Sequence, residues 1–354
     1  MWLQSALDAR VAAGAPGALA RMEVPRLGLA WHGAAGQLAR RASRALRPDD
    51  GVRVASVTKT VTAVAAVKLA RDGRLPLDGH LGDQLAPELL HRWSAFPALP
   101  RTTPRQLLTH TAGLPNYFGD EAFLTRARRD PDRVWRPVEL VDHAAAHGTP
   151  SFPPGQGFAY SDTGYVIAGI LLEQLTGRPL HQLYRDIVFD PLDMDSTWLE
   201  GHEAPRLQEV AHHYTGELDW TTLSPTIDWA GGGLVTTAPD LTRYVRALWA
   251  GQIIDSSGLD ELTRWIPGAS FPPGHMLRYQ RYGLGMGAIT VEGVELLWHT
   301  GFIGAFAFYA PYCDAVLVGT HNASDVDRWP LVAALCQQLR DPVPAEHPDR
   351  SNRP

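Results

Sequence analysis

The sequence has very little lysine. Among its 354 residues only Lys59 and Lys68 are lysines, and arginine occupies the other Lys/Arg positions. Arginine keeps its proton in proteins whereas lysine can release one, so a lysine retained against this bias favours a site whose chemistry needs a titratable amine. Lys68 lies nine residues after Lys59, about half a turn away around a helix of 3.6 residues per turn, and we interpret it as a surface residue.

Cysteine is also scarce, and several targeting signals are missing. Cys313 and Cys336 have no zinc-binding or redox spacing, so we predict two buried free thiols. No apolar run reaches the length of a membrane span. The first residues contain no basic segment and no long apolar core, so we see no signal peptide and expect a cytoplasmic location.

The charge distribution argues against some partners. The net charge is −6 without a block of like charge, which disfavours nucleic acid, and we expect no membrane partner. The 14 histidines form no convincing ligand set, so we predict neither a metal nor a cofactor. A hydrophobic fraction of 45% predicts a large buried core, and the sequence leaves the oligomeric state open.

One stretch, from Val54 to Leu69, embeds a polar pair in an apolar run. It is too long for an ordinary strand, and Gly73 suits a left-handed helix end, so we predict a buried helix with Ser56 as N-cap or first-turn residue. Because Ser56 and Lys59 are three residues apart, they share one face of that helix.

This pair forms a Ser-x-x-Lys arrangement, in which a desolvated lysine activates a serine nucleophile without histidine. The spacing alone is weak, since Ser and Lys at roughly 6% each give about one chance match in a chain this long. The scarcity of lysine strengthens the interpretation, and an ordinary solvated helix lysine is the alternative.

Apolar periodicity predicts strands at both ends of the chain and helices between them. The expected strands are two or three over 17–31 and 36–42, with turns at Pro25 and Gly33, and then 283–290, 294–298, 304–309 and 315–320. The expected helices cover 3–13, 104–109, 137–147, 163–175, 180–189, 237–249 and 329–339.

We therefore predict an α/β (α+β) fold: an antiparallel sheet built from N- and C-terminal segments and flanked by helices, with an inserted, mostly helical subdomain. One catalytic domain would span 1–340, with its sheet region at about 1–74 and 230–340 and its helical region at about 75–229. The remainder, 341–354, would be a flexible tail. A cleft should lie where the two regions meet, beside the Ser56 helix.

Two further stretches supply candidate residues for that cleft. In the first, a proline-stiffened loop from Phe152 presents Tyr160 just before an apolar helix, and Asp162 follows. Packing of the ring on the next helix is the alternative for Tyr160, and a helix N-cap is the alternative for Asp162.

The second stretch, 297–304, ends an expected strand. Its small residue, Gly301, lets a substrate backbone approach the strand, and the amide of Phe302 can point into the cleft. A lone histidine such as His299 has a structural role as its ordinary alternative.

In this order and spacing, these stretches resemble the serine hydrolases of the class C β-lactamase and DD-carboxypeptidase superfamily. That penicillin-binding-protein-like group includes family VIII carboxylesterases and D-aminopeptidases, and the resemblance covers about residues 17–339. Supporting stretches are Gln106-Leu-Leu-Thr-His-Thr-Ala-Gly-Leu114, Phe152-Pro-Pro-Gly155, Gly231-Gly-Gly-Leu-Val-Thr-Thr237 and Tyr282-Gly-Leu-Gly285.

The resemblance implies a role for each candidate. Ser56 would be the nucleophile, Lys59 its activating lysine and Tyr160 the tyrosine of the second motif. The triplet His299-Thr300-Gly301 would replace Lys-Thr-Gly, with His299 lining the cleft and assisting electrostatically. The amides of Ser56 and Phe302 would form the oxyanion hole.

These residue types imply an acyl-enzyme on Ser56. Lys59 and Tyr160 would share the serine proton, provided that the ammonium lowers the pKa of the tyrosine, and the sequence leaves open which of them is the base. Asp162 stands where the family usually has asparagine and cannot donate a hydrogen bond when ionised. Facing Lys59, it would hold the ammonium and accept from a substrate N–H or amine.

The expected substrate is a small ester or a short amide or peptide, D-amino acids included, with a slight preference for the ester. A DD-carboxypeptidase or a β-lactamase is the alternative, and a non-catalytic penicillin-binding-like receptor is a further one. In secreted DD-carboxypeptidases of this family an arginine directly follows Tyr-Gly-Leu-Gly-x, whereas here Gly287 follows Met286. Arg278 and Arg281 are the nearby candidates to replace that arginine.

Overall fold

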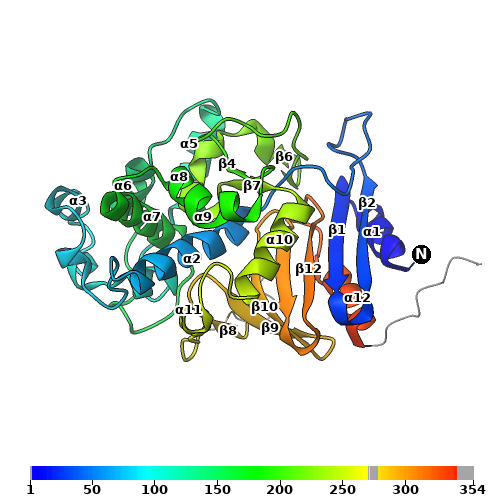
Figure 1. Cartoon of the computed structure of the whole chain (residues 1–354). Helices are drawn as coiled ribbons and strands as arrows, with labels where there is room; N and C mark the ends of the chain where they lie inside the picture. The colour runs from blue at the N-terminus through cyan, green and yellow to red at the C-terminus, as the bar shows by residue number, and fades with distance from the viewer. Residues whose placement is uncertain (1, 270, 272–277, 341–354) are drawn as a thin grey trace, which may run out of the picture.

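A seven-stranded antiparallel sheet forms the centre of the computed structural model, which describes residues 2–269, 271 and 278–340 (Figure 1). The two N-terminal strands extend the C-terminal sheet, with Leu19 paired opposite Thr320. The predicted antiparallel sheet from both ends of the chain is therefore confirmed. In sheet order the strands are β2 (Leu29–Gly36), β1 (Gly17–Val24), β12 (Ala315–Thr320), β11 (Phe306–Ala310), β10 (Val294–Thr300), β9 (Gly287–Val291) and β8 (Arg281–Tyr282).

Helices cover both faces of this sheet (Figure 1). α1 (Trp2–Ala12) and α12 (Trp329–Arg340) pack together on one face, and α10 (Ala238–Trp249) packs on the other against β1, β11 and β12. α10 begins where the sequence predicts, because the Thr237 side chain accepts a hydrogen bond from the amide of Asp240 and caps the helix.

The helix α2 (Thr58–Arg71) lies between the sheet and the helical region (Figure 1). Eleven of its fourteen residues are buried. Its small and β-branched side chains allow close packing against α7 (Asp162–Thr176) and α9 (Trp229–Gly232). It ends at a left-handed Gly73 with φ of 71°, as predicted. The other helices are α3 (Pro87–Arg92), α4 (Pro104–Leu108), α5 (Glu121–Arg129), α6 (Pro137–His147), α8 (Leu180–Tyr184) with a π-helical turn at Arg185–Phe189, and α11 (Ser256–Leu262).

Two expectations for the N-terminal strands are wrong. Gly33 lies inside β2 rather than in a turn, and segment 36–42 forms no strand. At Gly33 a Cβ atom would meet the side chains of Trp31 and Gln4 at 2.7 and 2.8 Å, so the glycine provides room for α1 on the sheet. β2 ends at Gly36, whose φ of 77° turns the chain away.

A small sheet of very short strands, in the order β3-β7-β4, and a separate hairpin were not predicted from the sequence. Strands of two or three residues carry no periodic signal. The expected strand 283–290 starts later, at Gly287, because Gly285 turns with φ of 67° against the Lys59 carbonyl. These short strands are β3 (Val52–Arg53), β4 (Trp198–Leu199), β5 (Tyr214–Thr215), β6 (Leu218–Asp219) and β7 (Leu234–Thr236).

Other predictions concern single residues and the tail. Cys313 and Cys336 are both buried and free, as predicted. Lys68 is partly exposed and pairs with Asp72, which agrees with its predicted surface position. None of the helices in the described part of the chain has the length and apolar character needed to cross a membrane. The predicted tail, 341–354, lies outside the described residues.

Candidate active site

Ser56 lies in a single 3-10 turn, Ala55–Val57, that leads directly into α2. The residue before it, Ala55, has a φ of 44°, a left-handed conformation that is unfavourable for a residue with a Cβ atom. Such backbone strain recurs at functional sites, where the surrounding structure holds it in place. The turn presents the Ser56 side chain without a capping hydrogen bond, so the predicted N-cap role is wrong and the first-turn position is close to correct.

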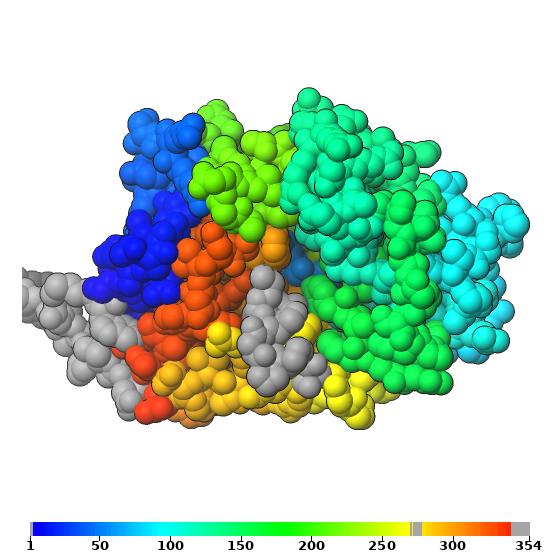
Figure 2. Space-filling view, turned by 180° about the vertical axis from the view of Figure 1, so that it is seen from behind, coloured from blue at the N-terminus to red at the C-terminus, as the bar shows by residue number. Residues whose placement is uncertain are grey.

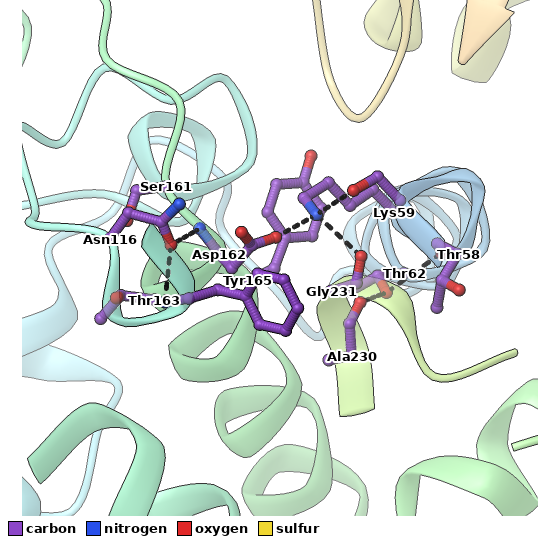
Figure 3. A network of polar contacts seen from close by, with 12 residues as sticks. Thr58, Lys59, Thr62, Asn116, Ser161, Asp162, Thr163, Tyr165, Ala230 and Gly231 are labelled. Carbon is purple, nitrogen blue, oxygen red and sulfur yellow. Dashed lines mark hydrogen bonds and ion pairs between the residues drawn. The ribbon is translucent and has the colours of Figure 1, made fainter. Parts of the chain in front are cut away.

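The Lys59 side chain is fully buried and has three polar partners (Figure 3). Its Nζ lies 3.1 Å from Ser56 Oγ and 2.7 Å from the carbonyl oxygen of Gly231, and it forms an ion pair with Asp162 Oδ1. Three partners satisfy an ammonium with three N–H donors. They equally satisfy a neutral amine that donates twice and accepts the Ser56 hydroxyl proton.

Asp162 is the first residue of α7, and its carboxylate faces Lys59 as predicted. It makes no helix-capping hydrogen bond, which removes the alternative of an N-cap role. Its backbone amide donates to the side-chain oxygen of Asn116 at 3.0 Å, so the start of α7 is fixed by another residue. The carboxylate is 9% exposed and is committed to the lysine.

Tyr160 packs directly beside this pair. Lys59 Nζ lies 4.9 Å from the centre of the Tyr160 ring, and this ring packs on His110 with the ring centres 4.1 Å apart and the planes tilted by 36°. Its hydroxyl oxygen is buried near the Ser56 hydroxyl, without a hydrogen bond of normal geometry to any residue in the described part of the chain. Burial, followed by the Asp162 charge, raises the Tyr160 pKa well above 10, and the nearby Ser56 hydroxyl offsets this in part. The condition under which Tyr160 could share the serine proton as a base, a pKa lowered by the ammonium, is therefore not met, because burial dominates.

His110 holds the tyrosine loop in place, a role that was not predicted from the sequence. Its carbonyl accepts from the amide of Ala159 at 2.9 Å, and its Nδ1 accepts from the amide of Ser161 at 3.2 Å. The two bonds bracket Tyr160 and fix its ring. His110 has a φ of 58°. It belongs to the 106–114 stretch that supports the family resemblance, so the sequence marked this segment without indicating what His110 does.

The His299 ring centre lies 6.2 Å from that of Tyr160, and within the described residues its two nitrogens bond to groups other than Ser56. Its Nδ1 lies 2.7 Å from the Thr300 carbonyl, which can only accept, so Nδ1 carries the proton and Nε2 accepts from the Tyr282 hydroxyl at 2.9 Å. Burial, followed by the Lys59 charge, lowers the His299 pKa to about 3. The structure thus gives His299 a neutral ring with both nitrogens bonded, and direct assistance in catalysis stays a prediction.

The strand end after His299 packs tightly against the nucleophile turn. A Cβ atom on Gly301 would lie 2.4 Å from the Val54 carbonyl oxygen, so only glycine fits here. The buried Arg328 donates to the carbonyls of Gly301 and Ala305 at 2.6 and 2.9 Å and fixes the loop that carries Phe302. Thr300 is buried, and both its amide and its hydroxyl bond to the Tyr279 hydroxyl.

A cavity of about 60 Å³ adjoins the nucleophile turn. Ala55 and Phe302 flank it, and it also contains Asp228, a carboxylate that was not predicted as a site residue although it lies three residues before Gly231. Burial, followed by the Asp162 charge, raises the Asp228 pKa to about 7. Figure 2 shows a hollow between the orange C-terminal strands and the green helical region, with blue atoms from the early part of the chain at its floor.

The chain belongs to the β-lactamase family, whose sequence pattern matches residues 3–334. A solved D-stereospecific amidohydrolase from Streptomyces sp. is 30% identical, with a TM-score of 0.80 and coverage of 94% of this chain and 97% of that chain. The D-amino acid amidase from Ochrobactrum anthropi SV3 is 26% identical, with a TM-score of 0.81 and coverage of 96% and 97%. The predicted family resemblance is therefore confirmed.

The matches to curated relatives cover less of this chain than the matches to the solved structures do. Penicillin-binding protein 4 from Amycolatopsis lactamdurans is 33% identical over 222 residues, which cover 60% of this chain and 54% of that protein. Other relatives are named as D-aminopeptidases and esterases. The chain spans about half the length or less of these curated relatives. Together the comparisons show a hydrolase family and leave the particular reaction open.

Proposed function

We propose that this protein is a serine hydrolase that forms an acyl-enzyme on Ser56 and cleaves a small ester or a short amide. The observation that carries the proposal is the 3.1 Å contact between Ser56 Oγ and the fully buried Nζ of Lys59. A buried amine in contact with a hydroxyl activates serine as a nucleophile. Tyr160 stands beside both groups with its hydroxyl unpaired in the described structure, ready for a proton-transfer partner.

Acylation follows from these positions. Lys59 first loses one proton from its ammonium form to solvent, and the free amine then takes the hydroxyl proton as Ser56 Oγ attacks the acyl carbon. The oxyanion lies on the amides of Ser56 and Phe302, where one such donor contributes about 3–4 kcal/mol in other enzymes. Tyr160 starts as a phenol because its pKa is raised, so it donates its proton to the departing oxygen or nitrogen.

Deacylation reverses these transfers. The Tyr160 phenolate, stabilised by the Lys59 ammonium, takes a proton from water as that water attacks the acyl carbon. Lys59 then returns its proton to Ser56 Oγ as the acid leaves. Each group ends as it began, and the sum is one ester or amide plus one water giving an acid plus an alcohol or amine.

The surroundings support a small acyl group. A cavity of about 60 Å³ corresponds to roughly four water molecules at 10–15 Å³ each, which suits a short side chain. Between the two substrate classes, we keep a slight preference for the ester over the amide. DD-carboxypeptidase and β-lactamase activities are the alternatives. A non-catalytic receptor would have no need for a fully paired buried lysine at the serine.

Covalent labelling tests the proposal. A fluorophosphonate probe should add to Ser56, as identified by mass spectrometry of the digested protein, and p-nitrophenyl acetate should be hydrolysed. Ser56→Ala should abolish both, with an unchanged circular dichroism spectrum. Ser94→Ala is the matched control, because Ser94 is exposed and lies outside the site, so this variant should stay active. Labelling elsewhere, or ester turnover that survives in Ser56→Ala, would refute the assignment.

A further inference from the structure

The cavity beside Ser56 combines aromatic rings with a carboxylate. Phe118, Trp220 and Phe302 line it and contact one another, with ring centres 5.2 to 6.2 Å apart. Asp228 lines the same cavity. Aromatic faces together with a carboxylate form the environment that proteins use to bind organic ammonium groups.

The charges around the cavity do not balance. Arg53 and Glu200 also line it, but they neutralise each other through two hydrogen bonds of 2.6 and 2.9 Å. Asp228 forms no ion pair with any residue in the described ranges. In the described lining it is therefore the carboxylate without a direct ion pair, and its sign favours a cation.

The other carboxylate of the site is already occupied. A Cβ atom built on Gly231 would lie 3.2 Å from Asp162 Oδ1, 3.4 Å from Asp228 Oδ1 and 3.5 Å from Lys59 Nζ, so the three charged groups surround one point. Two carboxylates thus share one ammonium. Asp162 holds it directly, which leaves Asp228 to face the cavity. Asp162 is therefore not free to accept a hydrogen bond from a substrate amine, as we expected from the sequence, whereas Asp228 is placed to do so.

We propose that Asp228 binds a cationic amine on the acyl part of the substrate, so that this hydrolase selects aminoacyl esters and amides over neutral acyl groups. The inference rests on the proposed function of Ser56. Ala55 and Phe302 border the same cavity and flank the proposed oxyanion hole. An amine at the cavity wall therefore lies close to the reacting carbonyl, which corresponds to an α-amino group next to a short side chain.

A pair of substrates that differ only in the amine tests this. Alanine p-nitroanilide, as both enantiomers, is compared with propionic acid p-nitroanilide at pH 7.5, where most of the α-amine is protonated. For the better enantiomer we expect the wild-type kcat/KM to exceed that of the neutral substrate by about ten- to a hundredfold, the usual effect of a hydrogen bond to a charged group. Asp228→Asn should remove this preference through a higher KM for the amine substrate, and should lower the turnover of the neutral substrate by a smaller factor.

Glu217→Gln is the matched control, because it removes one negative charge from a fully exposed side chain and should keep the preference. Binding can also be separated from chemistry. In Ser56→Ala protein, calorimetry should detect alaninamide binding more tightly than propionamide, and Asp228→Ala in that background should equalise them.

Three results would overturn the inference: no amine preference in the wild type, a preference that survives in Asp228→Asn, or an equal loss for both substrates. Fluorophosphonate labelling of Ser56 with neutral-ester turnover, but without amine preference, would leave the hydrolase assignment intact. Absence of labelling would instead remove the proposed function itself. If Asp228→Asn did not fold, the wild-type substrate pair and the Asp228→Ala binding experiment would still decide the question.

Discussion

The two sides of the candidate active site differ in how their charges are satisfied. On the lysine side, Lys59, Asp162 and the Gly231 carbonyl pair fully with one another in a buried contact (Figure 3). On the cavity side, Asp228 lines a pocket together with aromatic rings and has no ion pair among the residues that the structure describes. The lysine side is preorganised for one chemical step, which requires fixed partners. The cavity side has a carboxylate without a direct partner, and under our proposal the substrate group that pairs with this carboxylate determines selectivity.

The largest effect should come from breaking the lysine side without changing its charge. Lys59→Arg keeps the cation but removes any proton acceptor. We expect kcat to fall by about a thousandfold or more, as in Lys59→Ala, because the general base is lost together with nucleophile activation. Steady-state kinetics with a neutral ester measures this, and Lys68→Arg on the exposed end of α2 is the control. Rescue of most of the rate by arginine would reduce Lys59 to an electrostatic anchor.

A smaller effect is expected where the two sides meet, at the loop held by Arg328. Arg328→Met removes the two bonds to the Gly301 and Ala305 carbonyls and lets the Phe302 amide drift. A misplacement of about 1 Å can cost a hundredfold in rate, so we expect kcat to fall by about ten- to a hundredfold with KM nearly unchanged. Arg328→Lys should restore part of the rate. The exposed Arg243 serves for the control change to methionine. Equal changes in kcat and KM, without rescue, would indicate a structural role alone.

The contrast between the carboxylates should also appear in stability. Asp162→Asn leaves a buried ammonium without its partner, and breaking such a pair costs about 3–5 kcal/mol of unfolding free energy. Asp228→Asn should act differently, because burial raises the Asp228 pKa to about 7 from an ordinary value of 3.8. Between these values the folded state binds more protons than the unfolded chain, so the wild type loses this stability as pH rises from about 4 through 7.

Urea unfolding at pH 5 and pH 8 measures this difference. The decrease in unfolding free energy between the two pH values should be smaller in Asp228→Asn than in the wild type. Exposed Glu217→Gln serves again as the charge control. An identical pH dependence in wild type and Asp228→Asn would show that the pKa of Asp228 is not raised in the folded protein.

The lysine side could be predicted from sequence and the cavity side could not. Ser56, Lys59 and Tyr160 lie in local patterns of spacing, and the rarity of lysine in the chain is enough to single out Lys59. The importance of Asp228 depends on tertiary contacts, since its pKa is set by burial and by Asp162, a carboxylate 66 residues away in the sequence. The direction of the Tyr160 pKa shift could only be stated conditionally for the same reason: the sequence shows the neighbouring cation but not the depth of burial.

The fold shows the same division. Long periodic strands such as β12 and long helices such as α10 were predicted almost to the residue. The two-residue strands and the turn at Gly285 were missed, because tertiary packing rather than local pattern fixes them.

The smallest effect is expected at Arg281, which tests whether the cavity side could instead recognise a carboxylate. A terminal D-Ala-D-Ala needs a positioned arginine whose two-pronged guanidinium binds both oxygens. Arg281 forms an ion pair with Glu295 and stacks over Trp265, and Arg278 lies 3.7 Å from Asp327, so each already has its own partner. With Asp228 in the cavity, a substrate carboxylate would also meet a like charge. We therefore expect diacetyl-Lys-D-Ala-D-Ala to be cleaved far more slowly than a neutral ester, and Arg281→Ala to change either rate less than about twofold, as is usual for exposed ion pairs. Release of free D-Ala at a rate comparable to ester hydrolysis, abolished by Arg281→Ala, would reverse the assignment of the cavity from cation to anion recognition.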